Sequence, residues 1–143
     1  MKKIIILQGL PASGKSTYAR RLAESDPTKY VNINRDSLRK MCGKYWVPIR
    51  EPYISDLERY AISLALINGF IPIIDATNLN DSVLDEWKDI AYDYKAKIEY
   101  KTFPIQLEDA IERDSKREGD NKVGESVIKK FYNKYKHILD TWL

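Results

Sequence analysis

The chain alternates short apolar runs with longer segments in which apolar residues recur every three or four positions. Four runs predict strands, at residues 3–7, 30–33, 70–74 and 97–103. The first and third are apolar throughout, which is typical of strands buried on both faces of a parallel sheet. The fourth alternates, which predicts a strand exposed on one face at the edge of the sheet.

Segments with helical spacing lie between and after these strands. The predicted helices cover residues 16–23, 36–41, 54–68, 80–94, 107–111 and 126–139. Residues 42–52, with one glycine and two prolines, predict an irregular connection, and residues 113–124 form a polar, charged stretch. This alternation predicts an α/β fold, with a small parallel sheet of about four strands flanked by helices.

Length and composition favour one soluble domain spanning residues 1–143, with 43% hydrophobic and 31% charged residues. The single cysteine, Cys42, excludes an internal disulfide, and the single histidine, His137, excludes a multi-histidine metal centre. A thiol dyad of these two residues has no supporting flanking pattern. No apolar run reaches the length of a membrane span, so we expect a cytoplasmic protein without a membrane partner.

The net charge of +3 is unevenly distributed. Residues 1–50 carry 11 basic and 3 acidic side chains, whereas residues 51–100 carry 4 and 10. A basic first third suits a polyanionic ligand such as a nucleoside phosphate or a nucleic acid. A merely solubilising surface would give the same bias, so charge alone leaves both interpretations open.

The strongest motif follows the first strand. Residues 9–17 match the phosphate-loop pattern G-x-x-x-x-G-K-[ST], with a strand before and a helix after it. Backbone N–H groups of such a loop surround phosphate oxygens, Lys15 reaches the β- and γ-phosphates, and the Ser16 hydroxyl binds Mg²⁺. The motif predicts a site for ATP, or another nucleoside triphosphate, formed by Gly9, Pro11, Ala12, Ser13, Gly14, Lys15, Ser16 and Thr17.

Two aspartates follow other predicted strands. Asp75 ends the third strand, where a second contact to Mg²⁺ through water is expected, although a turn aspartate would also suit that position. Asp36 follows the second strand and shares a helix face with Arg39. Asp36 could accept the proton of a substrate hydroxyl while Arg39 holds a phosphate. A helix cap with a surface ion pair is the competing interpretation.

In combination, four segments resemble the kinase domain of phage T4-type 5′-hydroxyl polynucleotide kinases. They are the phosphate loop, residues 32–36 (Asn-Ile-Asn-Arg-Asp) with Arg39, residues 77–80 (Thr-Asn-Leu-Asn) and residues 114–117 (Asp-Ser-Lys-Arg). They occur in the family's order and span nearly the whole chain. The resemblance implies a P-loop kinase fold with a short lid.

The resemblance also implies roles for individual residues. Asp36 would be the general base on the 5′-hydroxyl, and Arg39 would hold the neighbouring phosphate of the acceptor. Thr77 and Asn78 would lie near the acceptor. Arg117, with Arg113, would close from the lid onto the donor phosphates, and Lys15 and Arg117 would stabilise the transferred group. Without the resemblance, the lid segment would be interpreted as a solvated charged loop.

Two features depart from that family. Its members often place an acid directly before the Thr-Asn pair, where this chain has Ala76, with Asp75 one residue earlier. Bifunctional members carry a phosphatase domain, whereas this sequence has no Asp-x-Asp segment, so we expect phosphorylation only.

Residues 43–50 combine aromatic and cationic side chains, which could stack nucleobases or simply pack Trp46 against the next helix.

The sequence therefore predicts an ATP-dependent kinase that uses Mg²⁺ and phosphorylates the 5′-hydroxyl of DNA or RNA that is single-stranded or has an exposed end. A kinase of a nucleoside, a sugar or a sugar-linked metabolite would share the phosphate-binding half. A non-catalytic nucleotide switch would need neither the general base nor the lid arginines.

Overall fold

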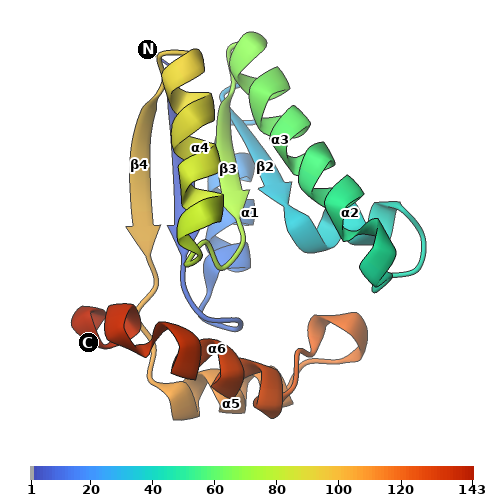
Figure 1. The fold of residues 1–143 in the computed structure, drawn as a ribbon, viewed down its shortest axis with the longest axis vertical. Coiled ribbons are helices and arrows are strands. Elements are labelled where there is room, and N and C mark those ends of the chain that lie inside the picture. The colour runs from blue at the N-terminus through green and yellow to red at the C-terminus, as the bar shows by residue number, and fades with distance from the viewer. Residues whose placement is uncertain (1) are drawn as a thin grey trace.

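A single parallel sheet organises the molecule. The computed structural model describes residues 2–143 and contains four strands in the order β2-β3-β1-β4 (Figure 1). The strands are β1 (Lys3–Gln8), β2 (Tyr30–Asn34), β3 (Ile71–Asp75) and β4 (Lys97–Thr102), and every neighbouring pair is parallel. The predicted α/β class is confirmed. The two continuously apolar runs are the central strands, and the alternating strand lies at an edge.

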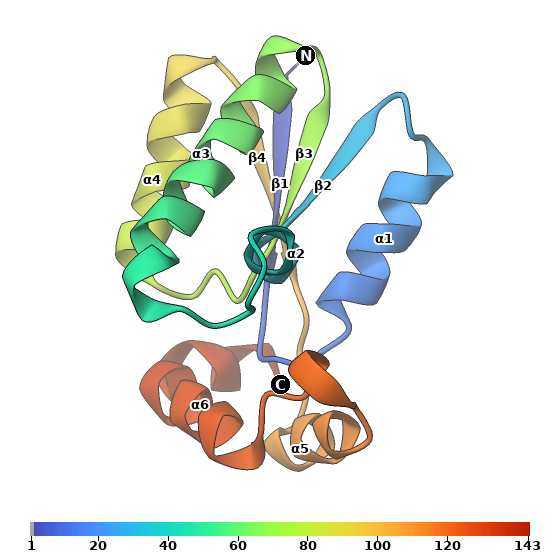
Figure 2. The same cartoon turned by 90° about the vertical axis from the view of Figure 1, so that its right-hand side faces the viewer.

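Helices cover both faces of the sheet. Helix α1 (Lys15–Ser25) lies on one face, and α3 (Glu51–Ile67) and α4 (Asp81–Asp93) lie on the other (Figure 2). The side chains of β1 alternate between two hydrophobic cores, as the pleat of a strand requires. Ile4 and Ile6 belong to the core that contains Trp87 of α4, whereas Ile5 and Leu7 pack with Ala19 of α1.

A helical hairpin lies beyond the carboxyl ends of the strands. It consists of α5 (Leu107–Ser115) and α6 (Glu125–Leu139), followed by a 3₁₀ turn at Asp140–Trp142 (Figures 1 and 2). Its core also includes Leu10 of the phosphate loop and Leu79 after β3. The two helices are therefore packed onto the nucleotide-binding end, and residues 116–124 between them form the loop of the lid.

The short helix α2 (Arg35–Met41) follows β2 and leads to α3 through residues 42–50, which include a 3₁₀ turn at Pro48–Arg50. The sequence predicted irregular structure through residue 52, but α3 begins at Glu51, with Pro52 in its first turn. Proline fits there because the first N–H groups of a helix have no partner inside the helix. Within residues 2–143, no helix combines the length and low polarity needed to cross a bilayer.

Candidate active site

The phosphate loop, residues 9–14, connects β1 to the first turn of α1. Gly14 directly precedes the helix with a φ of 103°, which favours glycine. At Gly9, a Cβ atom would lie 3.0 Å from Ser13 Oγ and 3.2 Å from both the Cβ and the carbonyl oxygen of Phe103, so a side chain there would force its neighbours to shift. Ser16 and Thr17 are exposed at the N-terminus of α1, where free N–H groups and the helix dipole favour an anion.

Lys15 is buried beneath this loop. Its Nζ atom donates hydrogen bonds to the carbonyl oxygens of Gly9 (2.9 Å) and Leu10 (2.7 Å) and to Ser13 Oγ (3.3 Å). Burial lowers the pKa of Lys15 to about 8, and the charge of Asp75 opposes that shift. Arg117 lowers this pKa further, whereas Asp36 raises it. The fold thus brings three other predicted site residues, Asp75, Arg117 and Asp36, into electrostatic range of Lys15.

Asp75 lies at the carboxyl end of β3 and is 3% exposed. Its Oδ2 atom accepts a hydrogen bond of 2.7 Å from Asn34 Nδ2, and Asn34 Oδ1 caps α2 by accepting from the N–H of Ser37 at 2.8 Å. Asn34 therefore links the carboxylate at the phosphate loop to the helix that carries Asp36. The sequence motif included Asn34, but we assigned it no role from the sequence.

The available donor set suits magnesium. Among the described residues, Asp75 Oδ1 receives no hydrogen bond from a side chain, and the Ser16 hydroxyl is exposed on the first turn of α1. A carboxylate and a hydroxyl are hard oxygen donors of the kind that Mg²⁺ prefers, and Mg²⁺ is usually held by few protein ligands together with substrate phosphates. Ser16 and Asp75 thus fit the metal-binding role predicted for them.

Asp36 lies on the first turn of α2, with its side chain 54% exposed. Its Oδ1 atom accepts two hydrogen bonds, from Arg39 Nη1 at 2.7 Å and from the Tyr45 hydroxyl at 2.8 Å. Burial, supported by the bond to Asp36, raises the pKa of Tyr45 to about 12, so this hydroxyl stays a donor at neutral pH. Asn34, not Asp36, caps the helix, which leaves the carboxylate free of that role.

Arg39 is fixed by partners that the sequence pattern did not reveal. Its Nε and Nη2 atoms both donate to the carboxylate of Glu51, at 3.0 and 2.5 Å. Burial opposes the charge, but hydrogen bonds to Glu51 and its negative charge raise the pKa of Arg39. Three of five N–H donors are used by Glu51 and Asp36, so two remain for a phosphate.

A second arginine anchors α2 to α3. Arg35 donates to Glu58 and to Ser55, both at 3.0 Å, and Glu58 is 2% exposed. Burial raises the pKa of Glu58, and Arg35 counteracts this shift. Arg35 therefore holds α2 against α3 through a buried carboxylate, and it also donates to Glu51, the partner of Arg39, at 3.4 Å.

Thr77 and Asn78 lie in the turn after β3. The carbonyl oxygen of Thr77 accepts a hydrogen bond from the Gly9 N–H at 3.1 Å, which ties this turn to the phosphate loop. The Asn78 amide is used inside the fold, where it donates to the carbonyl of Leu7 at 2.7 Å and accepts from Trp87 Nε1 at 3.0 Å. In this structure Asn78 positions the turn from within the core and is 3% exposed.

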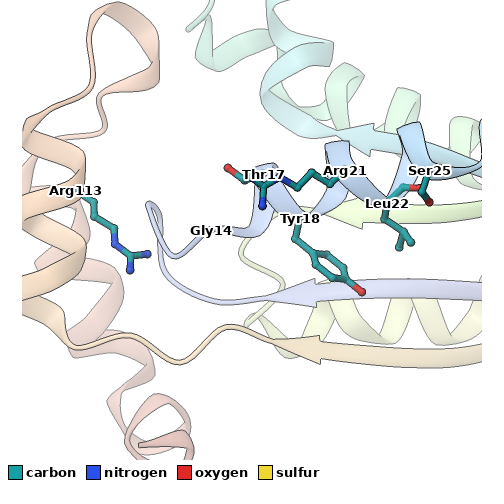
Figure 3. A pocket seen from close by; sticks show the side chains of 7 residues that line it. All are labelled: Gly14, Thr17, Tyr18, Arg21, Leu22, Ser25 and Arg113. Atoms are coloured by element: carbon teal, nitrogen blue, oxygen red, sulfur yellow. The ribbon is translucent and has the colours of Figure 1, made fainter.

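The two predicted lid arginines lie on different elements. Arg113 belongs to α5 and points toward the phosphate loop, where it lines a hollow of about 580 Å³ with Gly14 and Thr17 (Figure 3). The sequence placed Arg113 in the polar stretch, but the helix extends to Ser115. Arg117 lies in the lid loop and donates to the carbonyl of Asn121 at 3.4 Å.

Asp114 holds the lid loop closed at its base. Its side chain is 1% exposed, and its two oxygens accept hydrogen bonds of 2.8 Å each from the N–H groups of Val123 and Gly124. At the tip of the loop, Lys40 of α2 donates to Asn121 Oδ1 at 3.0 Å. The lid loop is therefore fixed at its base and contacts α2 at its tip.

Asp114→Asn is expected to loosen the lid, because an amide can accept at one oxygen only and its NH₂ group would face a backbone N–H. Leaving one buried donor unpaired costs about 1–3 kcal/mol. Faster hydrogen exchange at Val123 and Gly124, with a raised KM for ATP, is the expected result. Asp120→Asn in the same loop is the control, since Asp120 is exposed. Equal exchange in the two variants would contradict the role of Asp114.

Together, the parallel sheet, the phosphate loop with its buried lysine, and the arginines of the lid define a P-loop kinase, a class of phosphotransferase. The chain belongs to the AAA domain family AAA_33, whose model matches residues 4–138. This class implies binding of a nucleoside triphosphate and, typically, Mg²⁺.

Sequence similarity to curated proteins confirms the resemblance to polynucleotide kinases. A protein of Autographa californica nuclear polyhedrosis virus, named "Putative bifunctional polynucleotide kinase/RNA ligase", is 28% identical over 94% of this chain and 21% of its own length. The L-seryl-tRNA(Sec) kinase of Methanococcus maripaludis is 30% identical over 92% of this chain and 52% of its own length. The chain therefore spans about a fifth of the length of the viral protein and about half of the length of the archaeal kinase.

Solved structures share this fold. A chain of the Pnkp1/Rnl/Hen1 RNA repair complex superposes with a TM-score of 0.77 and 28% identity, over 99% of this chain and 46% of that one. A gluconokinase from Sinorhizobium meliloti shares the fold, with a TM-score of 0.59 and 20% identity, over 90% of this chain and 71% of that one.

Proposed function

We propose that this chain is an ATP-dependent polynucleotide kinase that transfers the γ-phosphoryl group to the 5′-hydroxyl of DNA or RNA. The observation that carries the proposal is the pairing of Asp36 with Arg39 at the carboxyl end of the sheet. The carboxylate of Asp36 and the guanidinium of Arg39 are 2.7 Å apart on α2, where they would act as a general base and a phosphate-binding cation. Residues 1–143 would form the kinase unit.

On the acceptor side, Asp36 would accept the proton of the 5′-hydroxyl as its oxygen attacks the γ-phosphorus atom. Arg39, oriented by Glu51, would use its two remaining N–H donors to bind the phosphate that follows the terminal nucleoside. Thr77 lies at the turn beside the phosphate loop, and Asn78 would act by keeping that turn in position.

On the donor side, the bond between the γ-phosphorus and the bridging oxygen of ATP breaks, and ADP leaves. Backbone N–H groups of residues 9–17 would bind the phosphates, Lys15 would move from the loop carbonyls to the β- and γ-phosphates, and Arg113 and Arg117 would approach from the lid. Ser16 and Asp75 would hold Mg²⁺, which would supply positive charge to offset the charge of the phosphates.

Two of the similar proteins support this substrate class. The viral relative is named for polynucleotide kinase activity, and a chain of an RNA repair complex superposes on 99% of this one. In such a setting, phosphate removal or ligation would be performed by other domains or other proteins.

A small-molecule acceptor is the second candidate, because two corynebacterial shikimate kinases are 38% identical over part of this chain. The match covers 44% of the chain in the Corynebacterium glutamicum enzyme. The phosphate-binding half would be the same in both cases, so only the acceptor region discriminates between them.

Label transfer from ATP to a panel of acceptors tests the proposal. The panel contains 5′-hydroxyl DNA and RNA oligonucleotides, 3′-mononucleotides, nucleosides and sugar alcohols, each with Mg²⁺. We expect oligonucleotides to have the highest kcat/KM and to compete against the monomers. A preference for a monomer would favour the second candidate, and label transfer to none of them would refute kinase activity on these acceptors.

A further inference from the structure

We propose that Trp46 forms a stacking subsite for a nucleobase behind the terminal nucleotide of a single-stranded acceptor. This inference rests on the proposed function and names the form of the substrate. The subsite lies in the loop between α2 and α3, residues 42–50, outside the phosphate loop and the lid.

Trp46 is held beside Arg39, the partner of Asp36, while its ring remains accessible. Its side chain is 54% exposed, and the Arg39 guanidinium carbon lies 5.5 Å from the centre of its ring. The same guanidinium donates to Asp36 at 2.7 Å. A nucleic acid whose 5′-hydroxyl lies at Asp36 and whose next phosphate lies at Arg39 would thus extend toward the indole ring of Trp46. The face of an indole ring can stack on any nucleobase.

The loop that presents Trp46 is fixed in spite of its irregular backbone. Arg50 donates to the carbonyl oxygens of Arg39 and Cys42, both at 3.3 Å, and of Lys44 at 2.5 Å, so one guanidinium fastens the loop from α2 onward. Tyr45, next to Trp46, is bound to Asp36. A stacking surface that is already ordered loses little conformational entropy when a base binds.

The charge of the segment favours a nucleic acid over a protein partner. Residues 37–50 contain four basic and no acidic residues, and Lys40 and Lys44 are exposed. Met41 and Ile49 add exposed apolar surface, 68% and 91% exposed. An aromatic ring among cations is the combination that binds single strands, by stacking the bases and tracking the phosphates.

The test compares wild type, Trp46→Ala and Trp46→Phe on two acceptors, a 5′-hydroxyl hexanucleotide and a 3′-mononucleotide. Tyr92→Ala is the control, because Tyr92 is an 85% exposed aromatic residue on α4. We expect Trp46→Ala to raise KM for the hexanucleotide relative to the mononucleotide by about 5- to 100-fold, and Trp46→Phe to restore most of the difference.

A hexanucleotide series with one abasic position makes the test specific for stacking. In wild type, removing the base that contacts Trp46 should raise KM as much as Trp46→Ala does, and the variant should be insensitive to that removal. Equal losses on both acceptors would mean that Trp46 acts only through Arg39, and would overturn the subsite. An unchanged ratio of the hexanucleotide KM to the mononucleotide KM would also overturn it. If sedimentation then showed altered self-association, Trp46 would instead belong to a contact between protein chains.

The failure of the subsite and the failure of the proposed function are distinguishable. If wild type phosphorylates oligonucleotides and Trp46→Ala keeps the same preference for them, the subsite is wrong and the function stands. If wild type phosphorylates only monomers, both are wrong.

Discussion

Asp36→Asn is expected to lower kcat by roughly 10²–10⁴-fold, the usual contribution of a general base, while ATP still binds. The amide keeps an oxygen that can accept from Arg39 Nη1 and the Tyr45 hydroxyl, so the local contacts survive and the basicity is lost. Single-turnover label transfer to a 5′-hydroxyl oligonucleotide measures the rate, and equilibrium dialysis with ATP measures binding.

Asp56→Asn is a matched control for this variant. Asp56 is also an exposed carboxylate on a helix and pairs with an arginine three residues later, Arg59. It lies on α3, and we expect wild-type turnover when it is replaced. Near-wild-type transfer by Asp36→Asn would remove Asp36 from the reaction and leave only a surface ion pair.

Lys15→Met is expected to reduce kcat by about 10²–10³-fold, the effect of removing one group that stabilises charge in a transition state. Methionine has a similar length and fits the buried position, so the protein should remain folded in a thermal denaturation measurement. Lys29→Met, which changes an exposed lysine, is the control. Unaltered turnover of Lys15→Met would contradict contact between Lys15 and the transferred phosphate.

The lowered pKa of Lys15 also predicts a pH dependence of nucleotide binding. A bound triphosphate favours the charged ammonium, so binding above pH 8 must be accompanied by proton uptake. The affinity for ATP should therefore fall as the pH rises past 8, by at most about tenfold per pH unit. Titration calorimetry in buffers of different ionisation enthalpy detects this proton, and it should be absent in Lys15→Met.

The sequence was sufficient for most elements of the fold and for the position of the phosphate loop between β1 and α1. Buried parallel strands require continuous apolar runs, so β1 and β3 were recognisable, and the phosphate loop has fixed spacing because its backbone geometry is fixed. The start of α3 was missed because Pro52 reads as a break, although proline is tolerated in a first helical turn.

The supporting contacts of the site were not predictable. Glu51 orients Arg39 from a helix that begins twelve residues later, and Asn34 reaches Asp75 across 41 positions of sequence. These pairs exist only because the sheet places β2 beside β3 and α3 packs against α2. Asn78 differs in the opposite way. The motif predicted that it lies near the acceptor, but its side-chain amide is hydrogen-bonded inside the core.

Leu10 connects the phosphate loop to the C-terminal helices, although these segments lie far apart along the chain. It lies within the phosphate loop, yet its side chain is 1% exposed in the same core as Ile128 and Leu139 of α6. The stability of the phosphate loop is therefore expected to depend on the packing of the helical hairpin. Shortening a side chain of this core, such as Ile128, is therefore expected to lower the turnover number as well as the free energy of unfolding, because it would change the shape of the phosphate loop.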